Sequence, residues 1–412
     1  MKIIIFNYTH PQFPLVSAVR MREFSTSLAR KGHQVILCTS VLNNTDLSVP
    51  LQKGFESALN SHNWDTPFFL SCTPLEYKIL NKYRERKFNL FFNKILTFYY
   101  LIFKGGQFID WQNSVETYFP LIRNNFSPDI IWTTFLNLNC WNLARRLSQY
   151  CQCPYVLDIK DPWDAFIPFM LRGILIRPFR KASAFTANSE QQGLMNRKWL
   201  NRPFLVVYSG INPTLFEEKE IINTSEFRIT LIGSTYSEKI LEQFIQGIEL
   251  WVNQLENTFN KRNIFFCYAG TSSEVIERYT HNLKTLGCKI SINSNLSLEE
   301  MLRLCKKSNI NSYLWNIEGG FHHKLIELLA CKNPVIVYPG EFPESTNIVK
   351  ETNSILHICR TSNDIVENLN RIYYQYIDGH NNELQIDMSG YTWDSQTVKI
   401  EKIFKNIVNT EV

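Results

Sequence analysis

Residues 318–337 read EGGFHHKLIELLACKNPVIV, and this stretch decides the fold class. A glycine pair opens a segment whose apolar residues recur at helical spacing, and Pro334 ends it before a β-branched run. A helix joined by a short turn to an apolar strand is the repeating unit of a parallel sheet covered by helices. The stretch therefore predicts an α/β domain.

The same alternation extends outward over the rest of the chain. Strands are expected at 227–232, 264–268, 289–292, 311–314 and 334–338, and earlier at 2–6, 34–39, 130–133, 155–158, 184–187 and 205–208. Helical patterns separate these runs, including 238–259 and 298–307. A polar, acidic stretch at 213–226 is typical of a linker. We therefore predict two doubly wound α/β halves, with a cleft at the carboxyl ends of both sheets.

Composition narrows the class of protein. Of the 412 residues, 44% are hydrophobic and 20% charged, which is typical of a folded protein. A net charge of +5 is too small for a dedicated nucleic-acid coat, so no nucleic-acid partner is expected. Ten scattered cysteines without a Cys-x-x-Cys pair favour reduced thiols and a cytoplasmic location. Neither a signal peptide nor a run of ~20 apolar residues is found, and the glycine-rich dinucleotide fingerprint is missing.

The segment 78–104 combines basic and aromatic residues. It holds seven Lys or Arg against Glu85, and its apolar residues fall on one helical stripe. Those apolar residues are Phe88, Phe91, Phe92, Ile95, Leu96, Phe98, Tyr99, Ile102 and Phe103. Such a helix suits the headgroup region of an anionic bilayer, and it equally suits a buried helix with a solvated basic side. A second basic and apolar cluster at 169–181 favours contact with an anionic membrane surface.

Residues 231–239 (LIGSTYSEK) predict a strand that ends in Gly233, a hydroxyl-rich turn and a helix start. Backbone amides at a helix start attract anions, and Lys239 adds a full charge one turn in. A diphosphate leaving group would fit there. The alternative is an ordinary strand-to-helix turn with Ser237 as the N-cap and Lys239 in solvent.

Lys324 and Glu327 are three residues apart and so share one helix face. A carboxylate there can accept both hydroxyls of a ribose, while the lysine counters phosphate charge. The alternative is an exposed ion pair of at most about 0.5 kcal/mol. The adjacent His322 and His323 point about 100° apart on a helix, so no metal site is expected.

Residues 158–164 (DIKDPWD) directly follow a predicted strand. Carboxylates at the carboxyl end of a strand border the expected cleft. Asp158 and Asp161 could therefore orient acceptor hydroxyls, or one of them could act as a base. The alternative is that Asp161 caps the turn that Pro162 starts.

The order of these motifs resembles the family 4 retaining glycosyltransferases of GT-B fold over nearly the whole chain. The matching segments are 31–35, 128–132, 158–163, 184–189, 206–212, 233–239, 324–336 and 391–394. The resemblance implies an N-terminal Rossmann-like acceptor domain at 1–212 and a nucleotide-sugar domain at 227–390. It also implies that residues 391–412 form a helix crossing back onto the first domain.

The resemblance also implies roles for single residues. Glu327 would grip the donor ribose and Lys239 the diphosphate. Ser234 stands where the family often has an arginine, and Glu318 lies nine residues before Glu327 instead of the family's eight. The donor-binding set is Gly233, Ser234, Lys239, Phe321, His322, His323, Lys324 and Glu327; the acceptor-binding set is His10, Arg20, Asp158 and Asp161; and the catalytic set is Asp161, Lys239 and Glu318.

These features predict a retaining glycosyltransferase that needs no metal or other cofactor. It would move a sugar from a nucleotide-diphosphate sugar to a glycan or lipid-linked acceptor, in cell-surface polysaccharide assembly at the inner face of the membrane. Two alternatives stay open at this point. A sugar-nucleotide epimerase shares the two-lobed architecture, and a non-catalytic protein could bind the nucleotide sugar without turning it over.

Overall fold

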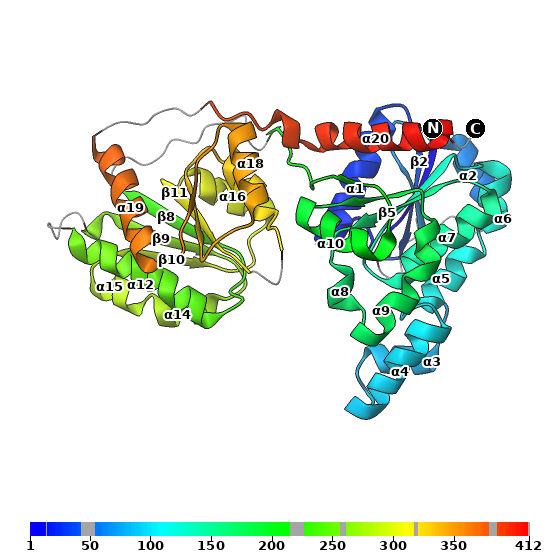
Figure 1. The fold of residues 1–412 in the computed structure, drawn as a ribbon, viewed down its shortest axis with the longest axis horizontal. Helices are drawn as coiled ribbons and strands as arrows, with labels where there is room; N and C mark the ends of the chain where they lie inside the picture. Colours follow the sequence, from blue (N-terminus) through cyan, green and yellow to red (C-terminus); the bar gives the residue numbers. More distant parts are fainter. Residues whose placement is uncertain are drawn as a thin grey trace. The chain divides into compact units, whose positions relative to one another are not determined.

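The computed structural model describes residues 1–13, 15–42, 54–214, 226–255, 261–316, 320–378 and 385–410. The chain divides into two compact units. The first unit comprises Met1–Gly210 and Trp393–Val412, and the second comprises Ile211–Thr392. Each unit is built around one parallel sheet flanked by helices (Figure 1), so the predicted doubly wound α/β class is confirmed.

The first sheet has seven parallel strands in the order β3-β2-β1-β4-β5-β6-β7. Their bounds are β1 (Lys2–Phe6), β2 (Gln34–Ser40), β3 (Phe68–Cys72), β4 (Ile130–Thr134), β5 (Tyr155–Ile159), β6 (Ala184–Ala187) and β7 (Phe204–Val206). Ile4 of the central strand pairs with Ile36 on one side and Ile131 on the other. Helices cover both faces of the sheet, which explains why the central strands are apolar without alternation.

Two helical insertions leave the carboxyl edge of the first sheet. The first, α3 (Lys78–Arg84) and α4 (Leu90–Phe103), follows β3; the second, α8 (Trp163–Phe166) and α9 (Phe169–Leu175), follows β5. The other helices of the unit are α1 (Val16–Arg30), α2 (Phe55–Ser61), α5 (Ile109–Glu116), α6 (Phe119–Asn125), α7 (Leu138–Cys151), η2 (Arg177–Lys181) and α10 (Glu190–Leu200). The single basic helix expected over 78–104 is therefore two helices.

The last helix, α20 (Trp393–Thr410), belongs to the first unit although it follows the second in sequence. It packs on α1, with the ring of Trp393 5.1 Å from that of Phe24. Ile400 and Phe404 are fully buried in the same cluster. The predicted return of the C-terminal helix to the first domain is confirmed (Figure 1).

The second sheet has six parallel strands in the order β10-β9-β8-β11-β12-β13. Their bounds are β8 (Phe227–Ile232), β9 (Ile264–Ala269), β10 (Lys289–Asn293), β11 (Ile310–Leu314), β12 (Val335–Tyr338) and β13 (Leu356–Ile358). The helices are α12 (Glu238–Gln254), α14 (Ser273–Tyr279), α15 (His281–Thr285), α16 (Leu298–Lys306), α17 (Lys324–Ala330), α18 (Pro343–Thr352) and α19 (Ser362–Ile377), with a short turn η4 (Ser389–Tyr391).

The strand order of the second sheet fixes where a ligand can bind. The chain runs outward from β8 to β9 on one side and from β11 to β12 on the other. The loops that leave β8 and β11 therefore diverge, and open α/β sheets bind ligands at the crevice between such loops. In the described part of the chain, no helix is both long and apolar enough to cross a membrane.

Candidate functional site

The side chain of Lys324 lies against the glycine turn that follows β8. Gly233 has φ +96°, and a Cβ built on it would lie 2.0 Å from the Nζ of Lys324. Only glycine therefore leaves room for the amine at this turn. The same Nζ lies 5.8 Å from the centre of the Tyr236 ring. Burial lowers the pKa of Lys324, while the nearby Glu327 opposes that shift.

The turn after β8 is held in place by the loop after β9. Tyr268 is buried at the end of β9, and its Oη donates to the Gly233 carbonyl at 2.6 Å. That same Oη accepts from the backbone N of Ser272 at 3.0 Å, and the Oγ of Ser272 accepts from the backbone N of Thr235 at 3.0 Å. These three hydrogen bonds fix the conformation of the turn.

Glu327 sits in the first turns of α17, beside Lys324. Its side chain is 18% exposed, and its Oε1 lies 3.7 Å from the Nε2 of His323. Burial raises the pKa of Glu327 to about 7, and the charge of Lys324 works against that rise. The carboxyl group therefore titrates near neutral pH, where a small change in its surroundings decides whether it is ionised.

His322 lies at the same edge of the second sheet, packed between two tyrosines. Its ring is stacked with Tyr313 at a centroid distance of 5.9 Å and meets Tyr236 edge-on at 5.7 Å. Burial lowers the pKa of His322 to about 4, so its imidazole is neutral at physiological pH. Phe321, the preceding residue, is also buried.

Sequence reasoning missed a second acidic residue at this edge, Glu341. It follows β12, accepts a hydrogen bond from the Tyr313 hydroxyl at 2.5 Å and accepts another from its neighbour's backbone N, that of Phe342, at 2.8 Å. Burial raises the pKa of Glu341 to about 7. The signal was present in the sequence, because a carboxylate shortly after a strand was the feature that singled out Asp158.

The structure brings most of the predicted donor residues to this one edge. Gly233, Lys324 and Glu327 are joined by the contacts above, and the hydroxyl of Ser234 lies 3.0 Å from that of Thr271. Phe321, His322 and His323 precede α17 at the same edge.

Lys239 differs from this group, because it is exposed in the first turn of α12 and Lys324 is the amine that lies against the glycine. Ser237 caps α12, as the alternative interpretation of that turn expected. Glu318 lies outside the described residues.

Arg20 and Asp158, which were expected to contact the acceptor, are paired with each other inside the first unit. Both side chains are fully buried, and two nitrogens of Arg20 donate to the two oxygens of Asp158 at 2.9 and 3.2 Å. Asp158 also accepts from the Thr186 hydroxyl at 2.7 Å, and Arg20 donates to the Val207 carbonyl at 2.9 Å. The pair ties α1 to β5 and β6.

His10 and Asp161 stay accessible on the carboxyl edge of the first sheet. His10 lies on the loop after β1, and its Nδ1 accepts from the backbone N of Gln12 at 3.2 Å. Asp161 lies just after β5, and its side chain is 27% exposed beside Lys160 at 3.4 Å. Among the described residues, no cluster of three or more His, Cys, Asp or Glu could hold a metal ion.

The chain matches no family model and no curated protein, but it is similar in fold to several solved structures. Sucrose-phosphate synthase from Thermosynechococcus elongatus is 13% identical, with a TM-score of 0.61 over 99% of both chains. HepE from Anabaena, solved with UDP-glucose, is 11% identical, with a TM-score of 0.61 over 98% of this chain and 100% of its own. A glycosyltransferase from Rickettsia africae is 14% identical, with a TM-score of 0.64 over 98% of both chains. The chain therefore has the GT-B fold.

Proposed function

We propose that this GT-B protein transfers a sugar, with retention of anomeric configuration, from a nucleotide-diphosphate sugar to a glycan or lipid-linked acceptor. The observation that carries the proposal is the position of the Lys324 amine against Gly233, beside Glu327, at the switch point of the second sheet. HepE and a trehalose-6-phosphate protein from E. coli, both of similar fold, were solved with UDP-glucose and UDP-2-fluoro glucose respectively.

The donor site follows from the chemistry of these groups. Gly233 leaves room for the Lys324 amine at the turn after β8, and the ammonium of Lys324 neutralises part of the charge of a diphosphate bound there. Glu327, once ionised, accepts hydrogen bonds from both hydroxyls of a ribose. Lys239 adds positive charge at the start of α12, where the helix dipole also favours an anion.

The same groups would lower the barrier to transfer. As the sugar–phosphate bond breaks, positive charge develops on the sugar ring and negative charge on the departing diphosphate. Fixed cations and amide dipoles at Lys324, Lys239 and the turn after β8 stabilise that negative charge. The acceptor hydroxyl forms the new bond to the sugar carbon, and its proton passes to the departing diphosphate. The resemblance to family 4 glycosyltransferases implies that Glu318 contacts the sugar and that Asp161 and His10 bind the acceptor.

The decisive experiment measures release of nucleoside diphosphate from a panel of UDP-, GDP-, ADP- and dTDP-sugars, with water as the slow acceptor. We expect release with one donor, and a loss of at least tenfold in Glu327→Gln, while the exposed control Lys350→Met on α18 keeps the wild-type rate. Conversion of the donor to an isomer without release would instead identify an epimerase. Binding that stabilises the fold without any turnover would identify a non-catalytic protein.

A further inference from the structure

Helix α4 presents an apolar face to solvent. Leu90, Phe91 and Phe103 are 83%, 73% and 72% exposed. The whole exposed set on this helix is Leu90, Phe91, Phe92, Ile95, Phe98, Tyr99, Ile102 and Phe103. Only Tyr100 and Leu101 of α4 are buried, and Tyr100 packs in a small cluster with Leu80 of α3. Eight exposed apolar side chains on one helix of 14 residues indicate an interaction site.

A second apolar patch lies on the other insertion of the first unit. Phe166 ends α8, and Phe169, Met170 and Ile174 are exposed on α9, the first two by about 80%. Because all strands of this sheet are parallel, the insertions after β3 and β5 leave its same edge. Figure 1 shows α4 and α9 at one end of the first unit. We call these exposed apolar residues of α4, α8 and α9 the apolar tip.

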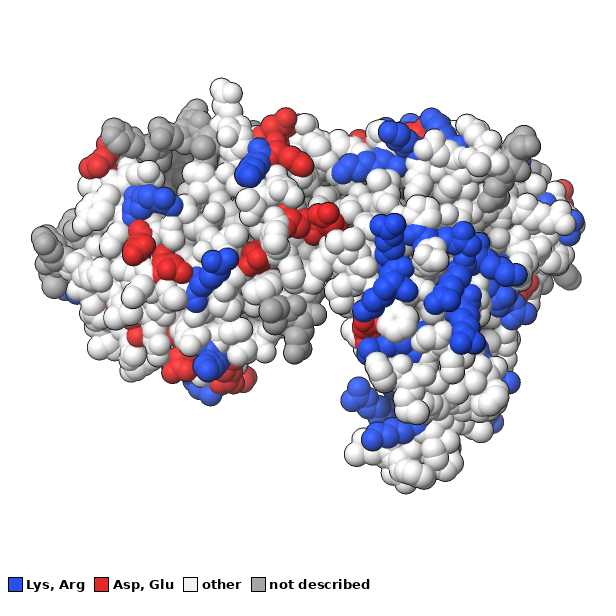
Figure 2. All heavy atoms as spheres, viewed as in Figure 1, with Lys and Arg blue, Asp and Glu red and all other residues white. Residues whose placement is uncertain are grey.

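Positive charge surrounds the apolar tip. Lys82, Arg86, Lys94 and Lys104 are exposed along the first insertion, and Glu85, its one acid, is already paired with Lys87. Arg177, Arg180 and Lys181 are exposed directly after α9. In Figure 2 the Lys and Arg side chains gather on one face of the first unit, above an end that is mostly uncharged. An apolar surface bordered by cations complements an anionic interface.

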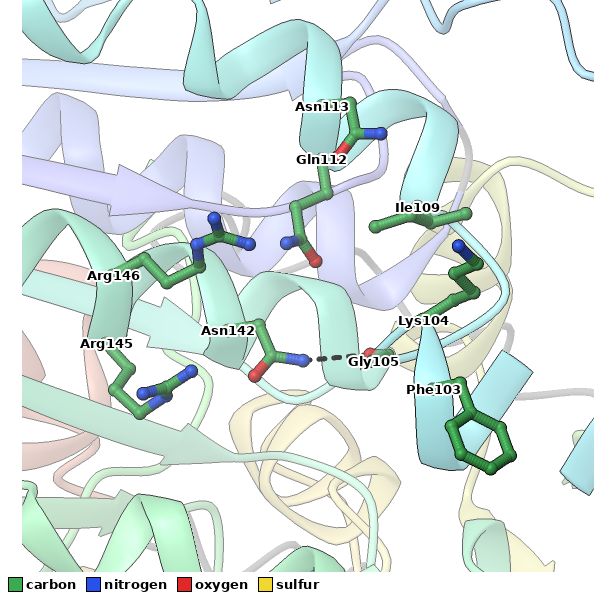
Figure 3. Close-up of a pocket in the computed structure, with 9 residues that line it drawn as sticks. All are labelled: Phe103, Lys104, Gly105, Ile109, Gln112, Asn113, Asn142, Arg145 and Arg146. Carbon is green, nitrogen blue, oxygen red and sulfur yellow. Dashed lines mark hydrogen bonds between the residues drawn. The ribbon is translucent and has the colours of Figure 1, made fainter. Parts of the chain in front are cut away.

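A cationic hollow of about 340 Å³ opens at the root of α4. Arg145 and Arg146 extend from α7 into the hollow, and Lys104 and Gly105 lie across from them (Figure 3). Arg146 is paired with Glu116 at 3.1 Å, so Arg145 and Lys104 supply the positive charge that is left. The Nε of Arg145 is buried and has no hydrogen-bond partner in the described part of the chain. The hollow adjoins a second one of about 490 Å³, lined by Ile79, Tyr99 and Tyr100, since Lys104 borders both. The second hollow is lined by apolar and aromatic side chains together with Glu76, Lys78 and Asn113. A cationic pocket beside a partly apolar one matches a phosphate headgroup and the start of its acyl chain.

We propose that the apolar tip docks this protein on an anionic phospholipid bilayer. The phenylalanines of α4 and α9 enter the boundary between headgroups and acyl chains. The surrounding lysines and arginines lie at the headgroup phosphates, one of which occupies the hollow beside Arg145. Docking brings the carboxyl edge of the first sheet, with His10 and Asp161, next to the bilayer surface. The proposal rests on exposed side chains and charge, and it stands or falls independently of the sugar-transfer reaction.

A vesicle flotation assay tests the proposal directly. The full chain is mixed with vesicles of phosphatidylglycerol or of phosphatidylcholine at low salt. We expect binding to phosphatidylglycerol at least tenfold stronger than to phosphatidylcholine, and its loss in 0.5 M NaCl, where charges are screened over about 4 Å. Equal binding to both lipids, or none to phosphatidylglycerol, would overturn the proposal.

Matched variants separate the two contributions to binding. Phe91→Ser with Phe103→Ser should lower phosphatidylglycerol binding at least tenfold, while Tyr374→Ser with Ile377→Ser, at two positions of α19 that are also more than half exposed, should not. Lys82→Glu with Lys94→Glu should also weaken it about tenfold, unlike the exposed control pair Lys350→Glu with Lys402→Glu. All variants are checked for native circular dichroism. If the phenylalanine variant instead dissolves a dimer and leaves vesicle binding unchanged, the tip is an interface between two copies and the proposal is wrong.

Discussion

At the residue scale, the carboxyl group of Glu327 makes the stability of the candidate donor site depend on pH. Burial holds its pKa at about 7, above the ordinary value of 4.5, so between these pH values the folded state keeps a proton that the unfolded chain has lost. The contribution of this group to stability is therefore present at low pH and falls as pH rises from about 4.5 to 7. We expect Glu327→Gln to raise the melting temperature more at pH 8 than at pH 5. An equal change at both pH values would contradict the buried position of the carboxyl group.

Gly233 is the residue on which the position of Lys324 depends. A methyl group there would meet the lysine amine, and the positive φ disfavours any other residue. We expect Gly233→Ala to weaken binding of a nucleoside diphosphate at least tenfold, measured by calorimetry. Gly390→Ala is the matched control in the same unit, because a Cβ at Gly390 meets nothing within 4 Å. Equal affinity in the two variants would show that the amine does not depend on the glycine.

The buried pair of Arg20 and Asp158 gives a prediction about folding. Removing one partner leaves the other charge buried without compensation, which costs about 3–5 kcal/mol. We expect Asp158→Ala to lower the melting temperature of the first unit by roughly 6–20 °C. The double variant Arg20→Met with Asp158→Leu should recover much of this loss, because no charge is left unpaired. A single variant as stable as the wild type would contradict the observed pairing.

At the scale of elements, α20 is part of the core of the first unit. The ring of Phe404 is fully buried and lies 6.0 Å from Trp132 of β4. Truncating such a side chain costs about 3–5 kcal/mol. We therefore expect Phe404→Ala to lower the calorimetric unfolding transition of the first unit and to leave that of the second unchanged. A shift of the second transition alone would show that α20 packs on the second unit and would contradict the prediction.

The elements that were predicted well are those whose sequence carries a local pattern. The β-branched central strands and the α17–β12 unit are examples, since apolar runs and Pro334 define them. The edge strand β3 was missed, because Phe68–Cys72 is short and its pairing with β2 is not visible locally. The helix over 78–104 was predicted as continuous, but Arg86 adopts a φ of 54° and the side chain of Asn89 caps α4.

At the scale of the whole molecule, the sequence predicted those site residues that lie close together in one segment. It did not predict contacts between residues that the fold brings together from distant segments. Lys324 and Glu327 are neighbours in sequence, and the glycine after β8 is a local signal. By contrast, Glu341 meets Tyr313 from a different strand, and Asp158 meets Arg20 across 138 positions. Spacing alone could not reveal that Asp158 is buried, nor that Lys324 instead of Lys239 lies against Gly233.

The central claim is that the second unit holds a nucleoside diphosphate between Gly233, Lys324 and Glu327. Calorimetric titration of UDP, GDP, ADP and dTDP into the wild type, Lys324→Met and the exposed control Lys350→Met tests it most directly. A charge-assisted hydrogen bond contributes about 1.5–3 kcal/mol, so we expect one nucleotide to bind the wild type and the control alike, and Lys324→Met at least tenfold more weakly. The claim is contradicted if none of the four nucleotides binds, or if Lys324→Met binds as tightly as the wild type.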